Sequence, residues 1–235
     1  DFYSKKPSVT YRGIFLNDED WGLQPWAAKT FEPETGDIGP KTYAKIFELL
    51  LRLNANTIWP AMHPSTKAFF YYPDNAKMAS LYNIVIGTSH AEPMLRNNVD
   101  EWNKKEFGAF NYKTNKDNVF SYWENRIKEA KNIDAIFSMG MRGVHDSGME
   151  GAKTKDEAVA ILDEVITDQR NLLKKYINKA VDICLNGLRP CFCNNCLPTD
   201  PPVQKPQHPG YQYLGLRPKD RWAMLAKNLP GRGRY

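Results

Sequence analysis

The sequence predicts an α/β fold built from consecutive strand–helix units. Short apolar runs alternate with longer helical segments along residues 11–179, and this alternation is typical of parallel βαβ units. Each of four expected strands is followed at once by polar or ionisable residues, which is where (β/α)8 barrels carry their chemistry. No GxGxxG or GxxxxGK[ST] phosphate-binding loop follows any of them. The prediction is therefore a partial (β/α)8 TIM barrel of about four βα units, followed by an irregular C-terminal tail.

The four expected strands are short apolar runs that end in polar loops. They cover residues 11–16, 56–62, 84–87 and 135–139. The first breaks into the polar segment that begins at Asn17, so we expect it to be a buried strand that ends in a loop.

Helical segments separate and follow these strands. The expected helices cover residues 40–54, 75–82, 92–105, 117–131 and 154–179. Pro40 stands in the first turn of the first helix, where proline is favoured, and apolar residues recur at i, i+3, i+4 and i+7 from Tyr43. Thr154 and Glu157 have the spacing of a capping box at the start of the last helix.

The composition changes abruptly near residue 180. Residues 1–180 contain equal numbers of basic and acidic side chains, whereas residues 181–235 contain 8 basic and 3 acidic ones, which accounts for the net charge of +5. All four cysteines and 8 of the 16 prolines also lie in residues 181–235. We therefore predict a partial (β/α)8 glycoside hydrolase catalytic domain at 1–180 and a divergent tail, disordered or non-native, at 181–235.

The sequence argues against a membrane span, a signal peptide, nucleic-acid binding and a metal site. No run of about 18 apolar residues exists, so we expect no membrane span. The first residues lack the apolar core of a signal peptide. The basic end, PGRGRY, is too short to predict binding to nucleic acid. Cys193 and Cys196 form only half of a zinc motif, and no metal or other cofactor is expected.

The residues that follow the strands are the candidates for a site. Because the carboxyl ends of barrel strands converge, we expect these side chains to share one pocket. They are Asp18, Glu19, Asp20, Trp21, His63, His90, Glu92, Arg142, His145 and Asp146.

Their chemistry suits an acidic sugar. The guanidinium of Arg142 can bind a substrate carboxylate through two hydrogen bonds, and a carboxyl group kept protonated nearby can act as a general acid toward a glycosidic oxygen. The three acids before Trp21 can bind sugar hydroxyls above an aromatic floor, or they can simply favour a helix N-terminus. The aromatic run at 69–72 fits sugar stacking and core packing equally well.

Four motifs in this order resemble glycoside hydrolase family 115, whose members are xylan α-1,2-glucuronidases. They are YRGIFLNDEDWGLQPWA, NTIWPAMHP, IGTSHAEPM and GMRGVHDSGM, and the likeness extends from about Val9 to Lys179. The resemblance implies a catalytic barrel within a larger multidomain protein, and an inverting mechanism without a cofactor. It also implies action on glucuronic or 4-O-methylglucuronic acid of glucuronoxylan or its oligosaccharides, a secreted or periplasmic location, and a homodimer for the full-length protein.

The resemblance also assigns roles to individual residues. It makes Asp146 the general acid and Asp20 a catalytic acid, with Glu19 beside it as an alternative for sugar contacts. His90 and Glu92 fall on the family's SHAEP motif, and Arg142 suits the uronate. His63 and His145 are weaker candidates for substrate contacts. The tail has no counterpart of the family's further strands, so we expect a truncated version, which loss of the general base would leave inactive.

Two other functions remain open from the residues alone. A metal-dependent barrel hydrolase is one, because His63, His90, His145 and Asp146 are residue types that bind zinc. A non-catalytic carbohydrate-binding remnant is the other. Activity that chelators abolish would favour the first, and binding to glucuronoxylan without release of sugar would favour the second.

Overall fold

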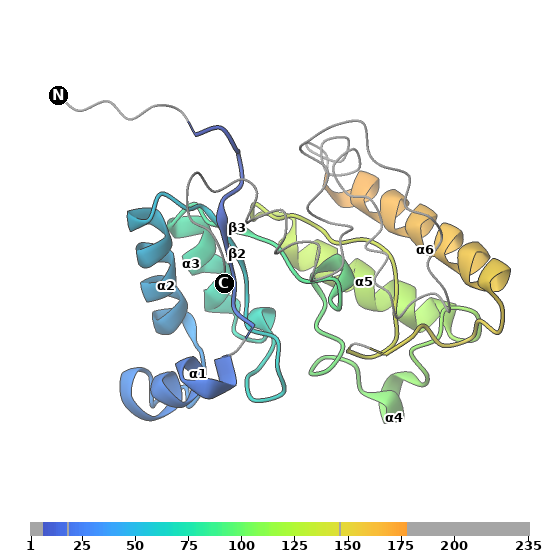
Figure 1. Ribbon diagram of the computed structural model, residues 1–235. Helices are drawn as coiled ribbons and strands as arrows, with labels where there is room; N and C mark the ends of the chain where they lie inside the picture. Colours follow the sequence, from blue (N-terminus) through green and yellow to red (C-terminus); the bar gives the residue numbers. More distant parts are fainter. Residues whose placement is uncertain (1–6, 18, 146, 178–235) are drawn as a thin grey trace, which may run out of the picture.

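The computed structural model of the protein describes residues 7–17, 19–145 and 147–177. Asp18, Asp146 and the predicted tail at 181–235 lie outside the described residues, so the hypotheses on them stay predictions. Figure 1 shows the arrangement of the elements. In chain order they are β1 (Gly13–Phe15), the 3-10 turn η1 (Glu19–Trp21), α1 (Leu23–Trp26), the π-helical turn η2 (Ala27–Phe31), α2 (Pro40–Arg52), β2 (Thr57–Trp59), η3 (Phe69–Tyr71), α3 (Pro73–Leu81), β3 (Val85–Ile86), η4 (Pro93–Leu95), α4 (Lys104–Phe107), α5 (Lys116–Ala130) and α6 (Lys155–Tyr176).

A small parallel sheet joins the strands in the order β1-β2-β3. Ile14 of β1 pairs with Ile58 of β2, and Ile58 pairs with Ile86 of β3. Spatial order thus follows sequence order, and neighbouring strands run in the same direction, as expected of consecutive βα units. The prediction of an α/β fold is confirmed, although the strands are shorter than the apolar runs that predict them.

Four helices lie where the sequence predicts them, namely α2, α3, α5 and α6. Pro40 occupies the first turn of α2, which buries the face that carries Tyr43, Phe47 and Leu50. The Glu157 backbone N–H donates to the Thr154 side chain (3.2 Å), so the predicted cap of α6 is confirmed. None of the helices in the described part of the chain has the length and apolarity needed to cross a membrane.

The prediction of a helix at 92–105 is wrong over most of that range. This segment contains only the turn η4 and the one-turn helix α4. Pro93 begins η4, and both Met94 and Leu95 have a φ of 60°, in the left-handed region that interrupts an α-helix. The Asn97 side chain then accepts nearby backbone N–H groups, an interaction by which asparagine competes with helix formation.

The strand expected at 135–139 is reduced to one parallel bridge between Ala135 and Ile86. Beyond the bridge, the carbonyl of Ser138 accepts the N–H of Met94 (2.8 Å). That carbonyl is therefore used by the loop after β3 and does not extend the sheet.

β1 is not the buried strand that the apolar run predicts. Gly13 and Ile14 are exposed, and Phe15 is half-buried. β1 lies at one end of the strand order, and within the described chain only β2 pairs with it.

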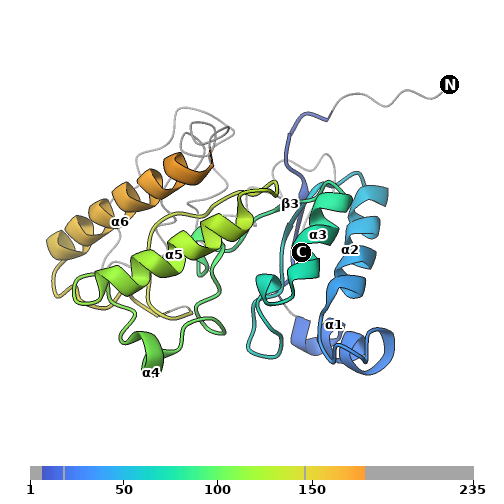
Figure 2. The same ribbon diagram turned by 180° about the vertical axis from the view of Figure 1, so that it is seen from behind.

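Two hydrophobic clusters form the core. In the sheet cluster, α2 and α3 pack on β2 and β3, and its most buried members include Tyr43, Phe47, Ile58, Ala79 and Ile86. In the helix cluster, α5 and α6 pack together with the segments after β3 and after the bridge, and its members include Val119, Trp123, Ile127, Val165 and Leu173. Figures 1 and 2 show α2 and α3 on one side of the strands, with α5 and α6 on the other.

Candidate functional site

Hydrogen bonds join the chain segments that follow the strands. The segment after β1 reaches the segment after β2 through Glu19, whose carboxylate accepts the N–H of Met62 (2.6 Å). The hydroxyl of Ser89, after β3, donates to Sδ of Met62 (3.2 Å). Asn98, also after β3, donates to the carbonyl of Gly143 (3.1 Å) in the segment beyond the bridge. The structure therefore brings together all four segments in which the sequence predicts site residues.

Glu19 is a buried carboxylate, with 2% of its surface exposed. Its Oε1 accepts the backbone N–H groups of Met62 (2.6 Å) and His63 (2.7 Å). Its Oε2 lies 3.7 Å from Nδ1 of His63 and has no hydrogen-bond partner among the residues that the structure describes. Because buried polar atoms are normally satisfied, this oxygen is suited to receive a hydrogen bond from a ligand hydroxyl or a water.

Asp20 follows Glu19 directly, yet it is exposed and contacts different groups. The hydroxyl of Ser65 donates to its Oδ1, and its Oδ2 lies 3.0 Å from Nδ1 of His63. The hydrogen bond from Ser65, helped by His63, lowers the pKa of Asp20. Asp20 is thus held as an anion that orients the His63 ring.

Glu92 is a second buried carboxyl group, in the segment after β3. Its Oε2 accepts a long hydrogen bond from the N–H of Ser89 (3.4 Å) and lies 3.3 Å from the hydroxyl oxygen of Ser89. Burial raises the pKa of Glu92 to about 8, and the charges of Glu101 and Glu19 act in the same direction. Glu92 is therefore mainly protonated at neutral pH, which is the state that a general acid requires.

The predicted residues of the last segment are connected to the segment after β3 through Asn98. Arg142 is buried, and His145 is half-buried with a φ of 54°. The N–H of His145 donates to Oδ1 of Asn98 (3.0 Å), which fixes the residue before Asp146. His90 is half-buried in the segment after β3.

The aromatic residues near the candidate site differ in exposure. Trp21 is 88% exposed, so its ring is available to a ligand. Trp26 stacks on Phe31, with ring centroids 4.7 Å apart. Phe69 belongs to the sheet cluster, whereas Tyr71 is exposed. The aromatic run at 69–72 therefore lies partly in the hydrophobic core.

Sequence reasoning missed Asp37, which shapes the segment after β2. Its buried carboxylate accepts hydrogen bonds from the hydroxyl of Thr66 (2.7 Å), the N–H of Lys67 (2.9 Å) and the hydroxyl of Tyr72 (3.2 Å). Asp37 lies in a loop between two expected elements, and no spacing rule distinguishes it from a solvated loop acid.

The sequence prediction also misses Asn97 and Asn98. The Asn97 side chain donates to the carbonyl of Met62 (3.0 Å), and Asn98 contacts both Gly143 and His145. Both asparagines fall inside the helix expected at this place. Two successive asparagines are unfavourable in a helix, and that signal was available in the sequence.

The three histidines do not form a metal site. Across residues 7–17, 19–145 and 147–177, no three side chains of His, Cys, Asp or Glu are placed to hold a metal ion. His63 contacts Asp20. The described residues therefore do not support the hypothesis of a hydrolase that binds its metal through His63, His90 and His145, and the further ligand of that hypothesis, Asp146, lies outside them.

Comparison with known families assigns the chain. The model of glycosyl hydrolase family 115 matches residues 4–186, a range that contains all four sequence motifs. The chain belongs to glycosyl hydrolase family 115. The family resemblance inferred from the motifs is confirmed.

A solved structure of family 115 resembles this chain. It is that of BtGH115A, a 4-O-methyl-α-glucuronidase with specificity for decorated arabinogalactans, and it is 49% identical with a TM-score of 0.69. The match covers 78% of this chain and 26% of that one, so this family 115 chain spans about a quarter of the length of the solved protein. No curated protein matches the chain.

Proposed function

We propose that this family 115 protein is a glycoside hydrolase that releases glucuronic or 4-O-methylglucuronic acid from decorated polysaccharides. Two observations support the reaction class. The family model covers most of the chain, and the similar solved protein is a 4-O-methyl-α-glucuronidase. The shared chemistry is the uronic acid, whichever polymer carries it.

The observation that carries the proposal is the pair of buried carboxyl groups in neighbouring segments. Glu19 offers an oxygen without a partner among the described residues, and burial keeps Glu92 protonated with a pKa of about 8. Hydrolysis of a glycoside requires one carboxyl group that donates a proton and one that accepts a proton. The region holds carboxyl groups in both states.

We retain Asp146 as the proposed general acid, because it occupies the aspartate of the family motif and follows Arg142 and His145. It would protonate the glycosidic oxygen as the bond to the anomeric carbon breaks. A carboxylate on the opposite side, for which Glu19 and Asp20 are the candidates, would take the proton of the attacking water. In inverting enzymes the two carboxyl groups are about 6.5–9.5 Å apart, which leaves room for this water.

The remaining candidates are proposed to bind the substrate. Arg142 would pair with the uronate through its guanidinium, and the exposed ring of Trp21 would stack on a sugar. The other proposed substrate contacts are Asp18, His63, His90, Glu92 and His145.

The finer fold and the location are part of the same proposal. We propose that residues 1–180 contribute about four βα units to a (β/α)8 barrel, which the sequential order of the parallel strands supports. A secreted or periplasmic location follows from a substrate that is an extracellular polysaccharide.

Release of the uronic acid tests the function. The purified protein is incubated with glucuronoxylan and, separately, with glucuronic-acid-decorated arabinogalactan, and the freed acid is quantified by anion-exchange chromatography. We expect release with inversion at the anomeric carbon. Asp146→Asn should lower kcat by about 10²- to 10⁴-fold, the usual contribution of a general acid. Asp74→Asn is the matched control, because Asp74 is an exposed carboxylate on α3 that pairs with Lys77.

Each outcome has a distinct meaning. Release from one polymer alone identifies the backbone that the enzyme accepts. Binding of both polymers without release from either would make the protein a carbohydrate-binding module. Absence of both binding and release would overturn the proposal.

A further inference from the structure

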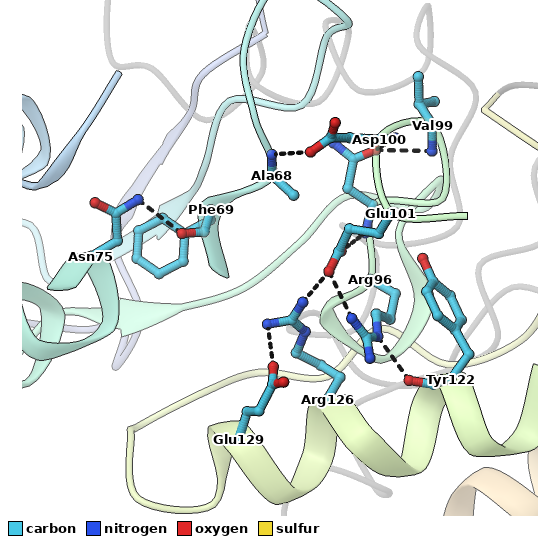
Figure 3. Close-up of polar contacts among 11 residues, drawn as sticks. Ala68, Phe69, Asn75, Arg96, Val99, Asp100, Glu101, Tyr122, Arg126 and Glu129 are labelled. Carbon is cyan, nitrogen blue, oxygen red and sulfur yellow. Dashed lines mark hydrogen bonds and ion pairs between the residues drawn. The ribbon is translucent and has the colours of Figure 1, made fainter. Parts of the chain in front are cut away.

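A cluster of charges lies between α5 and the segment after β3, and Arg126 is its buried member. Oε1 of Glu101 accepts a hydrogen bond from Nη1 of Arg96 (2.7 Å). The same oxygen accepts a hydrogen bond from the guanidinium group of Arg126, which belongs to α5. Arg126 is 2% exposed, and it also pairs with Glu129 of its own helix (2.8 Å). Figure 3 shows Glu101 between the two arginines. Ion pairs that are this buried often add little net stability, so their presence suggests another role.

The same carboxylate holds the backbone of the candidate site. Oε2 of Glu101 accepts the N–H of Asn97 (2.8 Å), and the N–H of Glu101 donates to the carbonyl of Asn97 (2.9 Å). The side chain of Asn97 donates in turn to the carbonyl of Met62 (3.0 Å). The N–H groups of Met62 and His63 are the two that hold Glu19. Four consecutive contacts thus lead from α5 to Glu19.

Asn98, the residue after Asn97, connects the same loop to the segment beyond the bridge. Asn98 donates to the carbonyl of Gly143 (3.1 Å) and accepts the N–H of His145 (3.0 Å). Two adjacent asparagines therefore set the distances between three segments that carry site residues. Asp100 adds a further contact, since it accepts the N–H of Ala68 (2.9 Å), as Figure 3 shows.

We propose that Glu101 and Arg126 are positioning residues, which fix Asn97 and Asn98 and through them the relative placement of Glu19 and the His145 segment. The effect on catalysis rests on the proposed function. The effect on the placement of the backbone does not. Glu101 contacts the backbone of Asn97, and its charge also contributes to the raised pKa of Glu92.

Paired variants of the two acids that share Arg126 provide the test. Glu101→Gln replaces one of the two carboxylate oxygens by an NH2 group, so the side chain can no longer accept from both the arginines and the N–H of Asn97. Glu129→Gln removes an ion pair within α5 and is the control. Arg126→Met is a second test variant, because it leaves Glu101 paired with Arg96 if Glu101→Gln fails to fold. Hydrogen exchange of the full chain is measured at the amides of Met62 and His145, relative to amides within α2.

We expect these two amides to exchange at least about 10-fold faster, relative to α2, in Glu101→Gln and in Arg126→Met, and less than about twofold faster in Glu129→Gln. In the active protein, kcat should fall by about 100-fold in the two test variants, as expected when catalytic groups are displaced by about 1 Å. A uniform rise at all amides, or none in either test variant, would show that the cluster only stabilises the fold. Failure of the wild type to release uronic acid would reject the function and leave the exchange result to decide the positioning.

Discussion

The raised pKa of a single side chain, Glu92, makes the stability of the folded protein depend on pH. Its pKa rises from the ordinary value of 4.5 to about 8 because the group is buried. The folded state therefore binds a proton more tightly than the unfolded state. The resulting stabilisation is fully present below about pH 4.5, declines as the pH rises and is lost above about pH 8.

We expect the unfolding free energy of the wild type to fall, relative to that of Glu92→Gln, by up to about 1.4 kcal/mol for each pH unit within this interval. Urea unfolding at several pH values between about 4 and 9 measures the difference. A constant difference between the two proteins across this range would show that Glu92 is not a protonated buried group.

The neighbouring acids of the first motif show what a sequence conveys about single residues. The sequence makes both acids candidates, with Asp20 as a catalytic acid and Glu19 as an alternative for sugar contacts. In the structure Glu19 is buried and Asp20 is exposed. The difference comes from the turn η1 and from partners 43 to 45 residues away, which local sequence does not reveal.

At the scale of elements, the pairing of β1 with β2 depends on a glycine. A Cβ atom added to Gly13 would lie 1.7 Å from the carbonyl oxygen of Thr57, whereas one added to Gly22 would meet nothing within 4 Å. We expect Gly13→Ala to lower the unfolding free energy by about 1 to 3 kcal/mol, because the two strands must move apart. Gly22→Ala should change it by less than about 0.5 kcal/mol. Denaturant titration of both variants tests this, and equal effects would contradict the close approach.

The helices were more predictable than the other elements. α2 and α6 have an apolar face and a recognisable start, at Pro40 and Thr154, and both features arise from local geometry. The segment at 92–105 has no such face, and its path is set by hydrogen bonds to Met62, Ser138 and other distant partners. Its irregular backbone is therefore a product of tertiary contacts.

At the scale of the molecule, the two core clusters meet at few side chains. Phe70 packs against both clusters and lies under the guanidinium of Arg126, 4.1 Å from its ring centroid. Phe70→Ala should lower the unfolding free energy by about 2 to 4 kcal/mol, since it removes contacts on both sides. Tyr71→Ala is the control. Because Tyr71 is exposed, its substitution should lower the unfolding free energy by less than about 1 kcal/mol. Equal losses in chemical denaturation would mean that Phe70 does not connect the clusters.

The sequence by itself determined the α/β order of elements, the buried faces of the main helices and membership of family 115. These follow from local periodicity, from capping residues and from four motifs whose identity does not depend on the fold. The tertiary structure decided that β1 is an exposed end strand, that Glu19 and Glu92 are buried while Asp20 is exposed, and that Glu101 contacts the backbone of Asn97. Burial and hydrogen-bond partners depend on which distant segments meet, and only the packed chain defines those meetings.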